Sequence, residues 1–96
     1  MSDPYEPPAE IKALLGKQVA VDTDSSYVYI GTLKSAGSDY LALSNVDVHD
    51  TTDTESTKEF YIHEVRKLGI KKNRQISYVR LARVISVAPL DEVIVF

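Results

Sequence analysis

The sequence has no cysteine and no apolar run near the length of a membrane-spanning helix. The absence of Cys excludes disulfides, thiolate nucleophiles and thiolate metal sites. Spanning a bilayer takes roughly 18–20 apolar residues, so we expect no such helix. The first ten residues are acidic and proline-rich, without the basic and apolar stretches of a secretory signal. These features predict a cytoplasmic protein with no membrane partner.

Patterns typical of catalysis or metal binding are also missing. The four glycines are dispersed and form no phosphate-binding loop. His49, with Asp47, Asp50 and Asp53 nearby, matches no calcium loop, and we interpret this segment as a solvated loop. His63 stands among charges that we expect to be exposed, and neither histidine has a nearby Ser or Cys in a nucleophile context. We therefore expect no enzymatic activity, no metal site and no cofactor.

The charged residues are unevenly distributed along the chain, whose net charge is −3. No Asp or Glu occurs between residues 65 and 90, whereas residues 39–64 are predominantly acidic. The basic residues of the first segment are Arg66, Lys67, Lys71, Lys72, Arg74, Arg80 and Arg83. Such an asymmetry predicts one acidic and one basic face, and the basic face can bind polyanions. Alternatively, the two segments neutralise each other across a subunit interface.

The length of 96 residues is that of one small domain. Residues 1–7 contain two prolines and no apolar periodicity, which predicts a disordered tail before a domain at residues 8–96. A short helix is expected at residues 9–15, where apolar residues share one face and Gly16 ends the element. A small domain without disulfides must be well packed or gain buried area from partners, which favours an oligomer.

Five short strands are expected from alternating apolar and polar residues separated by turn residues. Gly31 interrupts the second strand, and a glycine inside a strand usually marks a bulge or a bend. Small barrels need such bends to close. The expected strands span residues 18–23, 27–35, 39–48, 75–81 and 83–88.

Residues 58–68 have features of both a helix and a strand. A helix is favoured by a capping box from Ser56 to Glu59, by an apolar period of helical spacing, and by Gly69 as a terminator. Read as a strand, the same residues would alternate as Phe60/Ile62 and Tyr61/His63. We predict the helix, because the signals at both ends agree with the period.

Three motifs follow one another along the expected strands. The second strand contains Gly31-Thr32-Leu33, the third begins Asp39-Tyr40-Leu41, and the fourth leads into Val79-Arg80-Leu81-Ala82-Arg83-Val84. Over roughly residues 8–88 this arrangement resembles the Sm-like family of Sm, LSm and Hfq-type proteins, as a divergent bacterial or phage member. The resemblance implies an all-β fold: a small, five-stranded, strongly bent Sm-like (SH3-like) barrel with an N-terminal helix and a helix inserted before strand four.

The resemblance also implies how RNA would be bound. In the family, an aromatic residue of strand three stacks on a base and an Arg grips base and phosphate, which implies these roles for Tyr40 and Arg80. Ala42 stands where the family has a base-reading Asn, and Leu81 where it has a Gly. We therefore expect weak binding of single-stranded RNA without the family's usual base specificity. Independently, the three cations of residues 71–74 suit phosphate contacts or a solubilising loop. The expected RNA-binding residues are Tyr40, Arg80, Arg83, Lys71, Lys72 and Arg74.

Assembly is the second implication of the resemblance. We expect a homo-oligomeric ring of five to seven subunits, in which strand five of one subunit pairs with strand four of the next. The expected interface residues are Tyr78, Val79, Val84 and Ile85, because an unpaired edge this apolar would aggregate. The alternative function is an oligomeric scaffold or adaptor that binds a protein partner and has no nucleic-acid role. The acidic net charge and the apolar residues 93–96, which we expect to cover the core or a neighbouring subunit, favour that alternative.

Overall fold

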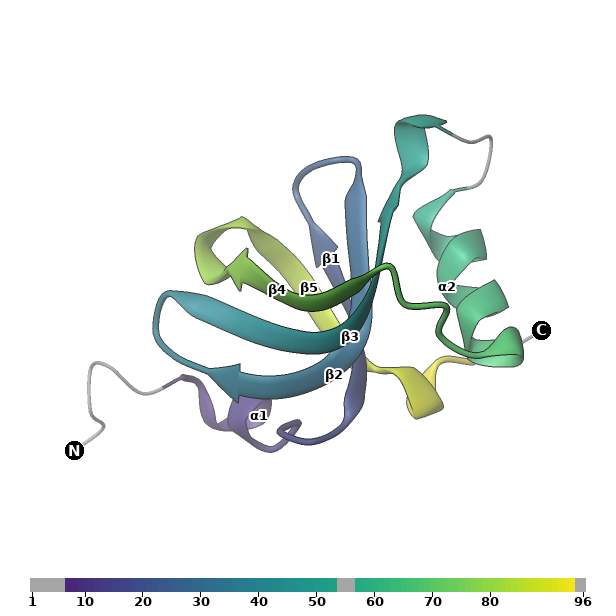
Figure 1. Ribbon diagram of the computed structural model, residues 1–96. Coiled ribbons are helices and arrows are strands. Elements are labelled where there is room, and N and C mark those ends of the chain that lie inside the picture. The colour runs from purple at the N-terminus through teal and green to yellow at the C-terminus, as the bar shows by residue number, and fades with distance from the viewer. Residues whose placement is uncertain (1–6, 54–56, 95–96) are drawn as a thin grey trace.

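The structure, a computed structural model, describes residues 7–53 and 57–94 (Figure 1). Within these residues the chain is mostly β, with one five-stranded antiparallel sheet and two short α-helices. The predicted all-β fold with an N-terminal helix and a helix inserted before strand four is confirmed at this level. The predicted disordered tail lies, apart from Pro7, outside the described residues, and so do Ser56 and residues 95–96.

All five predicted strands are present, each with its ends within two residues of the expected ones. They are β1 (Gln18–Thr23), β2 (Tyr27–Ala36), β3 (Tyr40–Asp50), β4 (Arg74–Arg80) and β5 (Val84–Pro89). The helices are α1 (Ala9–Lys12) and α2 (Lys58–Leu68), and short 3-10 turns cover Thr51–Asp53, Leu81–Arg83 and Leu90–Glu92.

Helix α1 is shorter than the predicted residues 9–15. The amides of Leu14 and Leu15 bond carbonyls three residues back, which tightens the turn, and Gly16 then takes a φ of 84°. The Gly16 amide donates to the Leu33 carbonyl at 2.8 Å, so the chain is drawn onto β2 before β1 begins. The hydrogen bond from Gly16 to β2 therefore ends the helix earlier than its pattern of apolar residues predicts.

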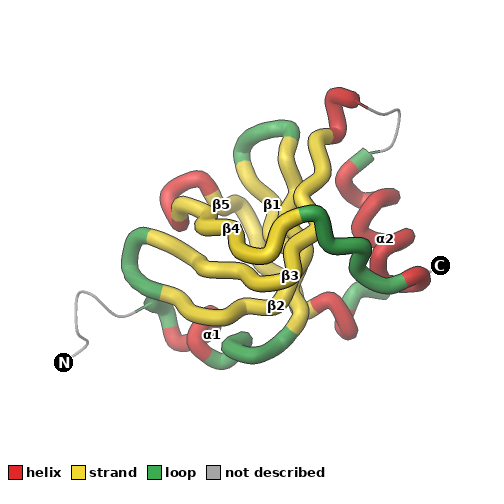
Figure 2. The backbone as a smooth tube through the Cα atoms, in the orientation of Figure 1, coloured by secondary structure: helices red, strands yellow, loops and turns green. Residues whose placement is uncertain are grey.

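The strands are ordered β4-β3-β2-β1-β5, so β4 and β5 form the two edges of the sheet. The three residues Leu81–Arg83 join these edges, and the sheet curls until β4 and β5 lie near each other at that end (Figure 2). Within the described residues the two edges do not pair with each other, and the sheet is therefore open. Each edge presents backbone groups that the sheet leaves without a ladder partner.

Gly31 allows β2 and β3 to approach closely, as the sequence predicted for a bend. The pairing register shifts between Ile30 and Thr32. A Cβ atom on Gly31 would lie 2.9 Å from the Ser44 carbonyl oxygen and 3.2 Å from the Val46 Cα. Only a residue without a side chain fits this contact, because both opposing atoms belong to the backbone.

The two faces of the sheet are packed by different parts of the chain. The concave face holds a core to which segments from every strand and the turn after α1 contribute. Its buried residues are Val19, Val21, Leu33, Leu41, Leu43, Val46 and Val79. The second cluster places α2 and the C-terminal segment on the opposite face, as its buried residues Ala20, Val28, Ile30, Val65 and Leu90 show. Both faces of the central strands are thus covered where α2 and the C-terminal segment lie (Figure 1).

Helix α2 confirms the helical interpretation of residues 58–68. It begins at Thr57, whose hydroxyl accepts from the Phe60 amide at 3.1 Å, and ends at Gly69, with φ 90°. The capping residue is therefore Thr57, one position after the predicted Ser56. Lys58 anchors the helix to the sheet, because its ammonium donates to the Asp22 carboxylate at 2.6 Å and to the Thr23 carbonyl at 2.9 Å.

The C-terminal segment covers the core in part, as expected. Leu90 is buried in the cluster beneath α2, and Val93 packs against that cluster. Ile94, in contrast, is exposed. Of the four apolar residues predicted to cover the core or a neighbouring subunit, the last two lie outside the described residues.

Replacing Gly31 with Ala should lower the free energy of unfolding by roughly 1–3 kcal/mol, because the new methyl group overlaps the backbone of β3. Gly37→Ala is the matched control, since its Cβ would meet its nearest atom only at 4.0 Å. Urea unfolding followed by circular dichroism measures both variants. Equal midpoints for the two variants would contradict this account of the bend.

Candidate nucleic-acid interface

The outer face of β3 and β4 brings two predicted RNA-binding residues together. Tyr40 pairs with Arg80 across the two strands, and Ala42 pairs with Tyr78. Tyr40 is 49% exposed and Tyr78 71% exposed, whereas Val79, between Tyr78 and Arg80, is only 4% exposed. Alternation along the strands therefore turns Val79 into the core and places Tyr40, Ala42, Tyr78 and Arg80 on one surface, called the outer face below.

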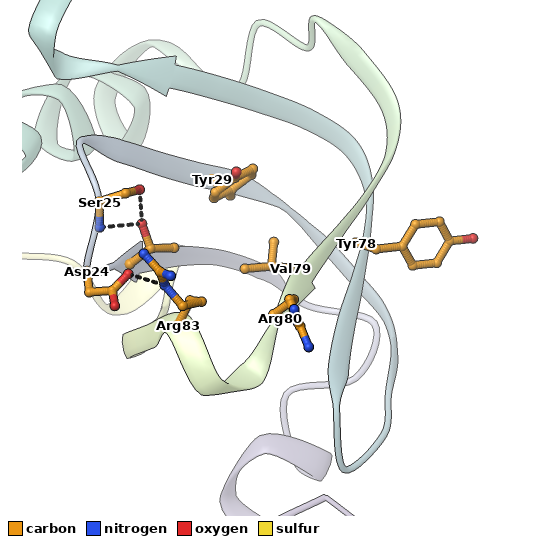
Figure 3. Close-up of a pocket in the computed structure, with 8 residues that line it drawn as sticks. Asp24, Ser25, Tyr29, Tyr78, Val79, Arg80 and Arg83 are labelled. Atoms are coloured by element: carbon orange, nitrogen blue, oxygen red, sulfur yellow. Dashed lines mark hydrogen bonds and ion pairs between the residues drawn. The ribbon is translucent and has the colours of Figure 1, made fainter.

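Arg80 and Arg83 differ in the partners they have. The Arg83 Nε donates to the Asp24 carboxylate at 2.7 Å, which ties the turn after β4 to the turn after β1. Within the described residues Arg80 makes no hydrogen bond and no ion pair. Both line a pocket of about 240 Å³, in which Val79 is directed toward Tyr29 and the Tyr78 ring points away (Figure 3). Of the two guanidiniums, that of Arg80 is the one available to a ligand.

The predicted basic loop is attached to β3 through Asn73. The Asn73 amide donates to the Val46 carbonyl at 2.8 Å. Its side chain accepts from the Val48 amide at 3.0 Å and donates to the Val48 carbonyl at 2.9 Å. Lys71, Lys72 and Arg74 flank this residue and are exposed. The role of Asn73 was missed by sequence reasoning, because its partners lie 25 residues away.

The structure divides the six predicted RNA-binding residues into two groups. Arg74 and Arg80 stand at opposite ends of β4, and at about 3.3 Å per residue they are roughly 20 Å apart. The basic loop therefore lies at one end of the strand, and Tyr40, Arg80 and Arg83 at the other. A single nucleotide does not reach both groups, whereas a strand of several nucleotides does.

The four predicted interface residues also separate. Tyr78 and Ile85 are exposed, Ile85 at 65%. Val79 belongs to the core on the concave face, and Val84 is half-buried against the same core. The side chain of Val79 therefore packs inside the subunit, because every second residue of an edge strand faces inward. Its predicted place in the interface stays a prediction that concerns the backbone edge of β4.

The histidine segment expected as a solvated loop is part of β3. Val46 and Val48 face the concave core, which turns Asp47 and His49 toward α2. There the His49 and Tyr61 rings stack at 3.8 Å between centroids. The Tyr61 hydroxyl donates to the buried Asp47 carboxylate at 2.6 Å, and burial together with this bond raises the pKa of Tyr61. These groups join the helix to the sheet.

Other polar residues suspected from sequence have structural roles as well. His63 is half-buried on α2, its Nε2 lies 3.4 Å from the Glu59 carboxylate, and the charged side chains around it are exposed, as expected. No group of three or more His, Asp or Glu side chains in the described part of the chain is arranged to hold a metal ion. None of the helices described has the length and apolar character to cross a membrane.

Comparison of the sequence with protein-family models found no match, and neither did comparison with curated protein sequences.

Asp50 joins the end of β3 to the turn between β1 and β2. Its carboxylate accepts from the Ser26 hydroxyl at 2.7 Å, from the Thr52 amide at 2.9 Å and from the Thr52 hydroxyl at 2.7 Å. The bond from the Thr52 amide, followed by those from the Ser26 and Thr52 hydroxyls, lowers the pKa of Asp50. The ionised form is thus stabilised by folding.

A lowered folded-state pKa means that Asp50 contributes stability above its unfolded pKa of about 3.9. That contribution should be lost as the pH falls through the lower folded value. Asp50→Asn should therefore reduce stability near pH 7 and flatten its decline in the acid range. Urea unfolding between pH 2 and 7 measures this, and parallel curves for the two proteins would contradict it.

Proposed function

We propose that this chain is an Sm-like module that assembles through its sheet edges and binds single-stranded RNA weakly, without the family's usual base specificity and without catalysis. The observation that best supports RNA binding is the outer face. It presents two exposed aromatic rings beside the guanidinium of Arg80, and aromatic rings with nearby cations suit stacked bases and phosphates.

The topology supports the Sm-like assignment. A short N-terminal helix precedes five consecutive antiparallel strands, a glycine marks the bend of β2, and a three-residue turn links the two edges. This order is the one that the resemblance implies. We further propose that the protein shares the family's closed barrel and its ring assembly.

The unpaired edges support assembly. An open edge is a template for pairing with another chain unless it is covered or charged. β4 presents exposed Tyr78 and β5 presents exposed Ile85, and both are large and apolar. When β5 of one copy pairs with β4 of the next, both edges are satisfied by one repeated contact. Such a head-to-tail contact closes into a ring if its rotation allows.

The basic loop supplies a second contact region for RNA. Lys71 makes no hydrogen bond or ion pair within the described residues, and Lys72 has only a 3.4 Å contact to the Asn45 side chain. The hydrogen bonds of Asn73 to β3 hold the backbone beside these cations, so that less backbone freedom remains to be lost on binding. A strand that follows β4 from this loop to Arg80 contacts both groups.

A protein partner remains the second candidate function, and one observation favours it. Phe60 and Leu68 are both more than half exposed on α2 and line, with Lys67, a hollow of about 360 Å³. This helix surface lies apart from the edges and from the outer face. An adaptor would use it to hold another protein.

Assembly is tested by the mass in solution, measured by light scattering. We expect a defined oligomer of five to seven copies of the 10.7 kDa chain. Ile85→Asp should dissociate it, because a charged side chain on an edge strand opposes pairing with another strand. Leu68→Asp, at an equally apolar exposed position on α2, should leave the mass unchanged. A wild-type monomer would contradict the assembly proposal.

RNA binding is tested by fluorescence anisotropy with labelled oligo-uridine and oligo-adenine at several salt concentrations. Tyr40→Ala should weaken binding by roughly 1–3 kcal/mol, the value of one stacked base. Replacing Lys71, Lys72 and Arg74 together with Ala should reduce the slope of log affinity against log salt by about 2, since each phosphate contact contributes about 0.7.

Lys17→Ala is the control for that experiment, because Lys17 is exposed and lies outside both groups. It should leave affinity and slope unchanged. If neither RNA binds the wild-type protein at low salt, the RNA proposal fails and the adaptor function replaces it.

A further inference from the structure

A hollow of about 460 Å³ lies on the outer face, where the turn between β2 and β3 meets β4. Tyr40, Ala42 and Tyr78 line it from the strands, and residues 35–39 close one end. Ala42 is only 7% exposed although it faces outward, so it forms a floor between larger neighbours. The hollow is therefore a slot with an apolar base and aromatic sides.

The spacing of the two tyrosines suits a single planar group. Tyr40 pairs with Arg80 and Tyr78 with Ala42, which makes the tyrosines diagonal neighbours on one face, with their backbone positions about 7–8 Å apart. From such positions two tyrosine side chains can reach one flat ring between them, each at the roughly 3.5–4 Å of van der Waals contact. Within the described residues neither ring makes a ring contact or a hydrogen bond. Both aromatic faces are free for stacking.

The closed end of the slot is polar, and its main polar group is the Asp39 carboxylate. Asp39 lines this end with Ser38, and its carboxylate has no hydrogen-bond partner among the described residues. The position of Asp39 is set through its backbone, since the Leu81 amide donates to its carbonyl at 2.8 Å. Asp39 is exposed, and an ionised carboxylate only accepts hydrogen bonds, so a ligand that carries donor groups suits this end of the slot.

We propose that this slot binds a guanine base, stacked between Tyr40 and Tyr78 with its Watson–Crick edge on the Asp39 carboxylate. Guanine carries two adjacent donors on that edge, the N1–H and the N2 amino group, which match the two oxygens of a carboxylate. Uracil offers one N–H between two carbonyl acceptors that the carboxylate would repel. The inference rests on the proposed RNA binding and specifies the base that this site selects.

Arg80 complements the acidic end of the slot. It stands directly opposite Tyr40, and its guanidinium has no partner within the described residues. A nucleotide whose base contacts Asp39 can therefore place its phosphate near Arg80. The carboxylate supplies discrimination between bases and the guanidinium supplies attraction for the backbone.

Tyr78 can line the slot and still lie on an assembling edge. Edge pairing uses the backbone groups of β4, which lie in the plane of the sheet, whereas side chains stand roughly perpendicular to it. Figure 3 shows the Tyr78 ring projecting away from the other labelled residues. Assembly therefore uses the backbone edge of β4, whereas base binding uses side chains on its outer face.

The experiment measures anisotropy with labelled pentanucleotides UUUUU, UUGUU and UUIUU, where I is inosine, which lacks the 2-amino group. We expect UUGUU to bind about tenfold more tightly than UUUUU, and UUIUU to lie between them, because two charge-assisted hydrogen bonds are reduced to one. Asp39→Asn should abolish the preference for guanine. The same change removes a negative charge and should leave UUUUU binding unchanged or tighter.

Tyr78→Ala should weaken UUGUU at least about fivefold through the loss of one stacking surface. Tyr27→Ala is the matched control, because Tyr27 is an exposed tyrosine outside the slot, and it should have no effect. Circular dichroism of each variant verifies that it is folded. Guanine preference that persists in Asp39→Asn would overturn the role of Asp39.

Equal affinity of the wild-type protein for UUUUU and UUGUU would overturn the guanine slot while the proposed RNA binding stands. Failure of all three oligonucleotides to bind would overturn both.

Discussion

At Gly31 the backbone of β3 lies where a side chain of β2 would otherwise stand. The Ser44 carbonyl comes within 2.9 Å of the position that a Cβ atom would take, and the register of β2 against β3 shifts at the same point. The opposite strand accommodates the bend with Asn45, whose φ of 52° is tolerated by its short polar side chain. Without this approach the sheet could not curl its edges toward each other, and the concave core would not close around Val79.

The features of the proposed site depend on the register of β3 against β4. In that ladder Tyr40 stands opposite Arg80, and Tyr78 opposite Ala42. A shift by one residue would turn the tyrosines inward and Val79 outward, since side chains alternate between the faces of a strand. Because the aliphatic residues of β3 and β4 are buried on the concave face, the residues between them, including both tyrosines, are placed on the outer face.

Polar side-chain contacts around the sheet attach the helix and the turns to the strands. Lys58 and the Tyr61–Asp47 bond hold α2 against the strands, Asp50 joins two turns, and Asn73 fixes the basic loop. Each is a side chain whose partners come from a distant part of the chain. Among the described residues, Arg80, Lys71 and the two outer tyrosines have no such side-chain partners, and all four lie on or near β4. These are the groups on which the proposed RNA binding rests.

Local sequence features determined much of the fold. The period and ends of residues 58–68 predicted α2, and the strands followed from alternation and turn residues. Gly31 was correctly interpreted as a bend, because a glycine inside an apolar strand has few other uses. Tyr40 and Arg80 were assigned to one site through their family resemblance, and the structure places them opposite each other.

Other features were decided by tertiary structure, because they depend on partners far away in the chain. The inward direction of Val79, the ion pair of Arg83 with Asp24, and the attachment of Asn73 to Val48 could not be derived from local pattern. The slot between Tyr40 and Tyr78 arises in the same way. Sequence determined which residues alternate along each strand, whereas the register between paired strands, set by burial of one apolar face, decided which of them face one another.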